Sequence, residues 1–163
     1  MMRYLFFSVL LLSIQVGAQN LECTNFDGTW VGRCYEADGT PYPNQDVVYF
    51  SQENCENLTY YHWNLKIGDV LLKSEVHENT KKTYVIHSNW NKDKTKVLFS
   101  LFASEMPGGD GSVYTTYVGD HTIEIVDGEL IKKDNMIIKR FTGEGWEVVK
   151  EANNHYCRLK KKE

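Results

Sequence analysis

Short runs of β-branched and aromatic residues, separated by turn-forming residues, most constrain the fold of this chain. No stretch beyond the N-terminus has the apolar spacing of a long amphipathic helix. Several runs alternate instead, so that Val97, Phe99 and Leu101 share one face while Ser100 points the other way. This alternation is typical of an antiparallel sheet with one buried face. It predicts strands over residues 28–35, 46–52, 58–66, 69–78, 83–90, 95–104, 112–118, 121–126, 129–133, 136–141 and 155–161.

Turn chemistry supports the same interpretation. Asp127-Gly128 stands between Ile123/Ile125 and Leu130, and an Asp-Gly pair supplies the positive φ that a two-residue hairpin requires. Further turns are expected at 38–39, 68–69, 91–94, 108–111 and 134–135, and residues 143–154 fit either a short helix or a loop. Strands spaced about 8–12 residues apart fit a barrel or a sandwich. We predict one all-β domain, an antiparallel up-and-down β-barrel of about 8–10 strands.

The N-terminus has the pattern of a secretory signal. Arg3 precedes an apolar run over 5–14, and Val16 and Ala18 occupy the two positions that a signal peptidase reads. The run is about half of the roughly 20 residues that a membrane span needs. We therefore predict a signal peptide over 1–18 and a mature domain over 19–163, secreted to an extracellular or periplasmic space, without a stable membrane anchor.

Four cysteines lie in the predicted mature domain, and an even number in an exported chain indicates disulfides. If the first two strands form a hairpin, Cys55 falls near Cys23. Closure of a barrel makes the first and last strands neighbours, which brings Cys34 to Cys157. Of the three pairings we favour Cys23–Cys55 with Cys34–Cys157.

The segment from Phe26 to Gly32 contains Gly28-x-Trp30 at the start of the first strand. In an exported all-β chain of this length, the motif resembles the calycin superfamily, which contains the lipocalins, the fatty-acid-binding proteins and the avidins. The resemblance implies a calycin-like barrel whose base is formed by Gly28 and Trp30, with an arginine of the last strand over the indole. Arg158 is the candidate for that arginine, through a cation–π contact. The chain ends on its last strand, which looks more like avidins or fatty-acid-binding proteins than like lipocalins.

Several classes of function find no support in the sequence. The predicted mature chain carries a net charge of −5 and no basic stripe, which disfavours nucleic acid as a partner. No Cys/His spacing suggests a metal site, and no motif suggests a cofactor. His77 lacks the second histidine of a metalloprotease helix, and the bridged cysteines offer no thiol nucleophile. The five histidines are expected on separate strands, facing solvent.

The aromatic content is more informative. A small barrel either packs solid or holds one ligand, and inward tyrosines would present hydroxyls inside an apolar cavity. We expect a non-enzymatic protein that binds a small apolar or amphipathic molecule, with contacts also from loops 37–45 and 106–111. The alternative is a secreted interaction or inhibitor module, for example of a hydrolase such as lysozyme, which engages a protein partner through exposed loops. A barrel-based isomerase or hydrolase would need convergent polar residues. The candidate ligand contacts are Tyr61, Trp63, Tyr84, Phe99 and Tyr114.

Overall fold

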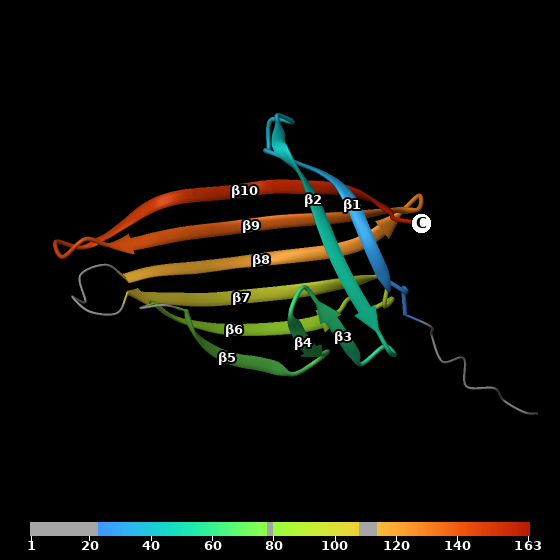
Figure 1. The fold of residues 1–163 in the computed structure, drawn as a ribbon, viewed down its shortest axis with the longest axis horizontal. Helices are drawn as coiled ribbons and strands as arrows, with labels where there is room; N and C mark the ends of the chain where they lie inside the picture. The colour runs from blue at the N-terminus through green and yellow to red at the C-terminus, as the bar shows by residue number, and fades with distance from the viewer. Residues whose placement is uncertain (1–22, 78–79, 108–113) are drawn as a thin grey trace, which may run out of the picture.

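The computed structural model describes residues 23–77, 80–107 and 114–163, and these residues form ten strands and no helix (Figure 1). The predicted signal peptide over 1–18 and positions 108–111 of the predicted loop lie outside the described residues. The strands are β1 (Gly28–Tyr35), β2 (Pro41–Gln52), β3 (Asn57–Tyr60), β4 (Trp63–Lys66), β5 (Val70–His77), β6 (Thr80–Trp90), β7 (Lys96–Pro107), β8 (Tyr114–Val126), β9 (Glu129–Phe141) and β10 (Trp146–Lys161).

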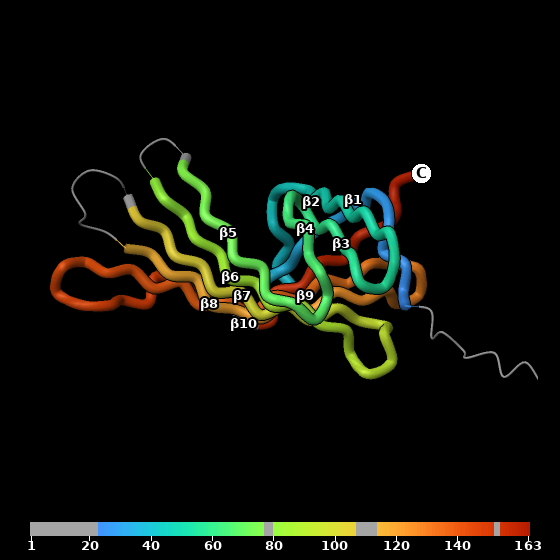
Figure 2. Tube along the Cα trace, turned by 90° about the horizontal axis from the view of Figure 1, so that it is seen from below, coloured from blue at the N-terminus to red at the C-terminus, as the bar shows by residue number. Residues whose placement is uncertain are grey.

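All ten strands belong to one antiparallel sheet. Its order is β4-β3-β2-β1-β10-β9-β8-β7-β6-β5, so the first strand pairs with the last and the rest follow the chain. The sheet curls into a nearly closed barrel, whose two end strands β4 and β5 are joined by residues 67–69. This confirms the predicted all-β antiparallel barrel. β1 and β2 cross over the long strands (Figure 1), and the hairpins of β5 to β10 extend beyond the part that β1 to β4 cover (Figure 2).

The hydrophobic core lies where β1 to β4 face the long strands. Inward-facing side chains alternate with outward ones along each strand, as the sequence pattern predicted for Val97 and Phe99. The register sets Val97 of β7 against Ile123 of β8, and both are fully buried. The buried cluster also contains Phe26, Trp30, Val48, Phe50, Leu58, Tyr60, Leu65, Ile86, Leu130, Cys157 and Leu159.

Both predicted disulfides are confirmed. Cys23 is bonded to Cys55, and Cys34 of β1 is bonded to Cys157, its register partner on β10. The second bridge links the first strand to the last, as the barrel argument required. Two disulfides fit an oxidising environment outside the cytoplasm. Across the described ranges, no helix has the length and apolar character needed to cross a membrane.

The predicted run 58–66 is wrong as a single strand. Tyr61 has a φ of 53°, which breaks the run into β3 and β4. Tyr61 therefore lies in the turn between the two strands, and not in one strand with Trp63 and Leu65 as the alternation had suggested. The side chain that joins Leu65 in the core is that of Tyr60, the residue before Tyr61, and Tyr60 is only 4% exposed.

Two predicted breaks are also absent. β8 runs on through Gly119 and Asp120, and β9 through Asp134 and Asn135. A Cβ on Gly119 would lie 2.4 Å from the carbonyl oxygen of Asn135, so this glycine permits close approach of two strands rather than a turn. Residues 143–154 form neither a helix nor a long loop, because β10 begins at Trp146.

Candidate functional site

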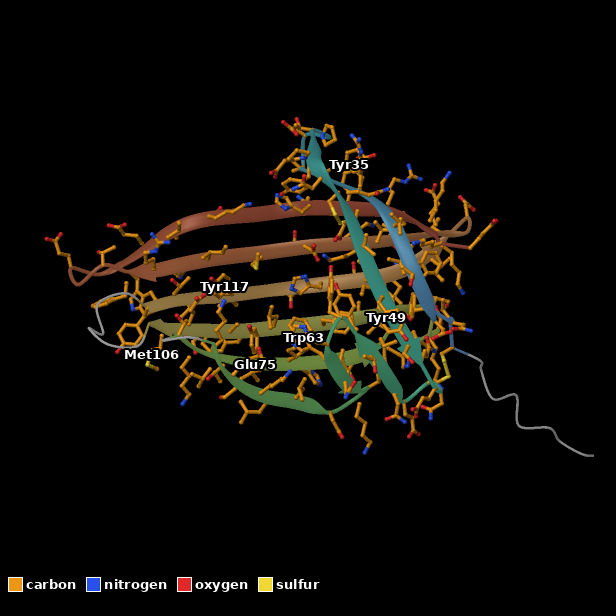
Figure 3. All side chains as sticks on the ribbon, viewed as in Figure 1. Tyr35, Tyr49, Trp63, Glu75, Met106 and Tyr117 are labelled. Carbon is orange, nitrogen blue, oxygen red and sulfur yellow. A yellow bond between two sulfur atoms is a disulfide. The ribbon has the colours of Figure 1, made fainter. Side chains whose placement is uncertain are left out.

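A small cavity, which we call the aromatic pocket, lies between the β3–β4 hairpin and the long strands. Its volume is about 140 Å³. The ring of Trp63 reaches across from β4 to lie 5.9 Å from the ring of Tyr84 on β6 (Figure 3). The lining comes from the β3–β4 hairpin and from β6 to β9, and it consists of Tyr60, Tyr61, Trp63, Ile86, Phe99, Leu101, His121 and Lys132. The pocket is therefore closed by the short hairpin and floored by the sheet.

Tyr60 organises the aromatic walls. Its ring stacks on Phe99 at 5.4 Å and on Phe50 at 5.1 Å, and it meets Trp63 edge-on at 6.0 Å. Burial raises the pKa of the Tyr60 hydroxyl well above its ordinary value, and it also raises the pKa of Tyr61. Both hydroxyls consequently stay protonated at neutral pH. The walls are uncharged and apolar, with a few polar atoms among them.

Two titratable side chains of the lining, His121 and Lys132, both bond to Asp134, which lies outside the lining. His121 Nδ1 lies 2.5 Å from Asp134 Oδ1, and Lys132 Nζ lies 3.1 Å from Asp134 Oδ2. The three side chains are only 14–17% exposed. Burial alone would raise the pKa of the Asp134 carboxyl, but the hydrogen bond from His121 and the charge of Lys132 outweigh it, so the pKa is lowered. Burial would likewise lower the pKa of Lys132, and the Asp134 carboxylate reverses that shift. A largely buried ion pair, with a histidine bonded to its anion, thus lies beside the pocket.

Two nitrogens in this pocket have no hydrogen-bond partner. Among the described side chains, Trp63 Nε1 and His121 Nε2 are the buried side-chain nitrogen or oxygen atoms left unpaired. Because Asp134 is an ionised acceptor, His121 Nδ1 carries the hydrogen of their bond, and Nε2 of a neutral imidazole presents a lone pair. Buried polar atoms are nearly always paired, and both exceptions belong to side chains that line this one cavity.

A larger outer cavity of about 440 Å³ adjoins the aromatic pocket, and Tyr61 and Lys132 line both. At its rim, His155 is paired with Glu36 and bonded through Nδ1 to the Tyr42 hydroxyl at 2.7 Å. Burial, followed by the proximity of Glu36, raises the pKa of Tyr42 to about 12. The outer cavity is therefore more polar than the aromatic pocket.

Asp46 in the outer cavity lies beside the Cys34–Cys157 bridge, with its Oδ2 3.5 Å from Cys34 Sγ. These three residues have the spacing of a metal-binding cluster. Both sulfurs are consumed by the disulfide and provide no thiolate, so the cluster does not fit a metal ion.

The structure brings three of the five predicted ligand contacts together. Tyr61, Trp63 and Phe99 line the aromatic pocket. Tyr84 touches Trp63 but lines a neighbouring cavity with Tyr117 and Met136, whereas Tyr114 is 37% exposed at the start of β8. Sequence reasoning missed Tyr60, Ile86, Leu101, His121 and Lys132.

The expectation that all histidines face solvent is corrected by two of them. His121 and His155 have side chains only 17% and 12% exposed, because each faces inward and is held by a carboxylate. The signal for His121 was its parity with Ile123 and Ile125, since alternate residues of a strand share a face.

The cation that lies over the Trp30 indole at the barrel base is not the predicted one. Trp30 is 3% exposed and donates from Nε1 to the Phe26 carbonyl at 2.8 Å. Lys161, not Arg158, lies over the indole, with its Nζ 5.8 Å from the ring centroid. Lys161 is the register partner of Trp30, whereas Arg158 points outward and pairs with Glu129. Gly28 has a φ of 119° and leaves room for the Lys161 side chain.

Comparison of the chain with protein-family models, with curated proteins and with solved structures finds no match. The nearly closed antiparallel barrel is consistent with a calycin-like fold. The function is accordingly argued from the site itself.

Proposed function

We propose that this chain is a secreted, non-enzymatic protein that binds a small apolar or amphipathic molecule in the aromatic pocket. The observation that carries the proposal is an aromatic-walled cavity lined by Trp63 and His121, two side chains that each have an unpaired buried nitrogen. Binding sites for small molecules are typically apolar hollows with a few placed polar groups. A volume of about 140 Å³ matches a cavity that accepts one benzene-sized ring.

An amphipathic ligand suits the two adjoining cavities. Its apolar part would fill the aromatic pocket, and its polar part would pass Tyr61 and Lys132 into the polar outer cavity. Lys132 is already paired with Asp134, so a polar tail gains attraction without requiring an unpaired buried charge.

A non-enzymatic role is supported by what lines the aromatic pocket. Its described lining contains no serine, threonine or cysteine that His121 could activate as a nucleophile. The raised pKa values of Tyr60 and Tyr61 keep their hydroxyls protonated.

The proposal also includes membership of the calycin superfamily and export directed by residues 1–18 as a signal peptide. The up-and-down strand order, the pairing of β1 with β10 and the buried Trp30 support the first. The two disulfides support the second.

The test is to fill the aromatic pocket from the sheet side. Leu101 of β7 lines the pocket, so a larger side chain at this position would occupy the space of a ligand. We expect L101W to lose binding of toluene and indole, measured by isothermal titration calorimetry on residues 19–163. The matched control is L98W on the same strand, because Leu98 is 40% exposed on the outer face and binding should persist. Equal binding by wild type and L101W, with both folded by circular dichroism, would refute the proposal.

A second candidate function is binding of a basic secreted protein through the outer face of the sheet. The outer apolar row consists of Leu72, Val85, Phe102, Val118 and Ile137, which are successive register partners across β5 to β9. Phe102 is 44% and Val118 49% exposed. The net negative charge of the chain would steer a basic partner toward it. Lysozyme is a suitable probe: inhibition that weakens with salt and is lost in F102S supports this candidate, and unchanged lysozyme activity contradicts it.

A further inference from the structure

We propose that the aromatic pocket selects a hydroxyl group on a single aromatic ring, that is, a ligand of the phenol class. This inference rests on the proposed binding function and specifies its ligand. It starts from Trp63 Nε1 and His121 Nε2, the two unpaired nitrogens that share this pocket.

The two nitrogens need different hydrogen-bond partners, one an acceptor and the other a donor. An indole N–H only donates, so Trp63 needs an acceptor. In the neutral form of its ring, His121 donates through Nδ1 to Asp134, and its Nε2 presents a lone pair that needs a donor. A neutral His121 also leaves Lys132 and Asp134 as a charge-balanced pair beneath the pocket.

A hydroxyl is the smallest common group that does both. It accepts one hydrogen bond from Trp63 and donates another to His121, and both side chains line the same cavity of about 140 Å³. A ketone or ether would satisfy Trp63 alone, and a primary ammonium would satisfy His121 alone. A carboxylate would set its negative charge against the His121 lone pair.

The ring is inferred from the walls. Tyr60 stacks on Phe99 and meets Trp63 edge-on, so the pocket already contains offset and perpendicular aromatic contacts. An additional ring continues that packing better than an aliphatic chain of equal volume. The volume admits one ring and few further atoms.

The experiment compares ligands of one ring that differ in hydrogen bonding. Residues 19–163, with both disulfides formed, are titrated with phenol, anisole, toluene, cyclohexanol and benzoate by calorimetry and by ¹⁵N NMR. Phenol should bind at least about tenfold more tightly than toluene, because one well-made hydrogen bond corresponds to about a tenfold change in the dissociation constant. Anisole should fall between them, because its oxygen accepts from Trp63 but donates nothing. The Trp63 indole resonance should move with phenol and anisole and stay in place with toluene.

Two variants assign the two bonds. H121F should reduce phenol to the affinity of anisole, while leaving Asp134 paired with Lys132. W63F should weaken phenol and anisole together. The matched control is H87F, because His87 is exposed on the outer face of β6 and bonded to Asn89, so phenol binding should not change.

The outcomes separate this inference from the function beneath it. Toluene binding as tightly as phenol, or benzoate or cyclohexanol binding best, overturns the phenol class and leaves the binding pocket intact. Phenol selectivity that survives in H121F and W63F overturns the roles of the two nitrogens. Absence of binding by every ring compound overturns both the inference and the proposed function. The wild-type comparison of phenol, anisole and toluene decides the ligand class even if a variant does not fold.

Discussion

The Cys34–Cys157 bridge fastens the first strand to the last, and its removal should cost more stability than removal of the other bridge. It closes a chain segment of 123 residues, whereas Cys23–Cys55 closes 32. A disulfide stabilises chiefly by restricting the unfolded chain, and the restriction grows with the logarithm of the closed length. The perturbations are the paired substitutions C34A/C157A and C23A/C55A.

The sizes follow from the closed lengths. The loop-entropy relation gives about 5 kcal/mol for the long loop and about 4 kcal/mol for the short one, hence a difference of about 1 kcal/mol. Each loss is comparable with the entire stability of a marginal domain, which is about 5 kcal/mol. The six register pairs between β1 and β10 would have to hold the barrel closed without the covalent link.

The assay is urea unfolding of residues 19–163, followed by tryptophan fluorescence, for wild type and both double variants. A shift of the midpoint at constant slope reports stability, and a changed slope reports a more compact or expanded unfolded state. C34A/C157A should unfold at the lower urea concentration. If C23A/C55A is the less stable variant, or if the loss in C34A/C157A is below about 1 kcal/mol, the loop-entropy reasoning fails.

Three further predictions concern single positions. A Cβ on Gly32 would lie 2.0 Å from the Arg158 carbonyl oxygen, so G32A should lower the free energy of unfolding by about 3 kcal/mol or more. The control G145A, where a Cβ would meet open space, should change the free energy of unfolding by less than about 0.5 kcal/mol. Equal losses of the two variants in urea unfolding would contradict this prediction. D134N should cost about 3 kcal/mol at pH 7 because it strips the partner from Lys132. The pKa of Asp134 is lowered from 3.8, so the difference from wild type should be fully present above pH 4 and should disappear as the pH falls further; a difference unchanged at low pH would contradict the assignment. Tyr61 separates the two cavities, so Y61A should raise the affinity for 2-naphthol relative to phenol in calorimetric titration, and an unchanged ratio would show that Tyr61 does not separate them.

The sequence was sufficient for the fold class because its signals are local. The Asp127-Gly128 turn has the expected positive φ at both residues, and Val126 pairs with Glu129 across it. β1 begins and ends where its run of β-branched and aromatic residues predicted. The cysteine pairing followed because barrel closure is a topological requirement rather than a detail of packing.

The errors arose where tertiary contacts override local preference. Asp134-Asn135 has the composition of a turn, yet Asp134 stays in β9 because His121 and Lys132 bond to its carboxylate. Residues 143–154 carry little β signal, but β9 provides a ladder for them from Phe141 opposite Trp146 onward. In both cases the partner lies on another part of the chain, and a local window contains no record of it.

The sequence predicted most of the aromatic contacts of the candidate site but not its polar ones, and the reason is a different one. Aromatic residues can be recognised as candidate ligand contacts from their type alone. The importance of His121 and Lys132 depends on which residues lie opposite them on the adjacent strands. Those neighbours can still be derived from the sequence, because a two-residue turn fixes register. Counting outward from Asp127-Gly128 places Ile123 opposite Lys132 and His121 opposite Asp134, and the structure has both pairs. The apolar parity of Ile123 and Ile125 then turns His121 inward, toward a carboxylate on the adjacent strand. A tight hairpin recognised in the sequence therefore predicts buried polar pairs across its strands as well as the strands themselves. The pair His121–Asp134 is one of them, and the ligand hypothesis depends on it.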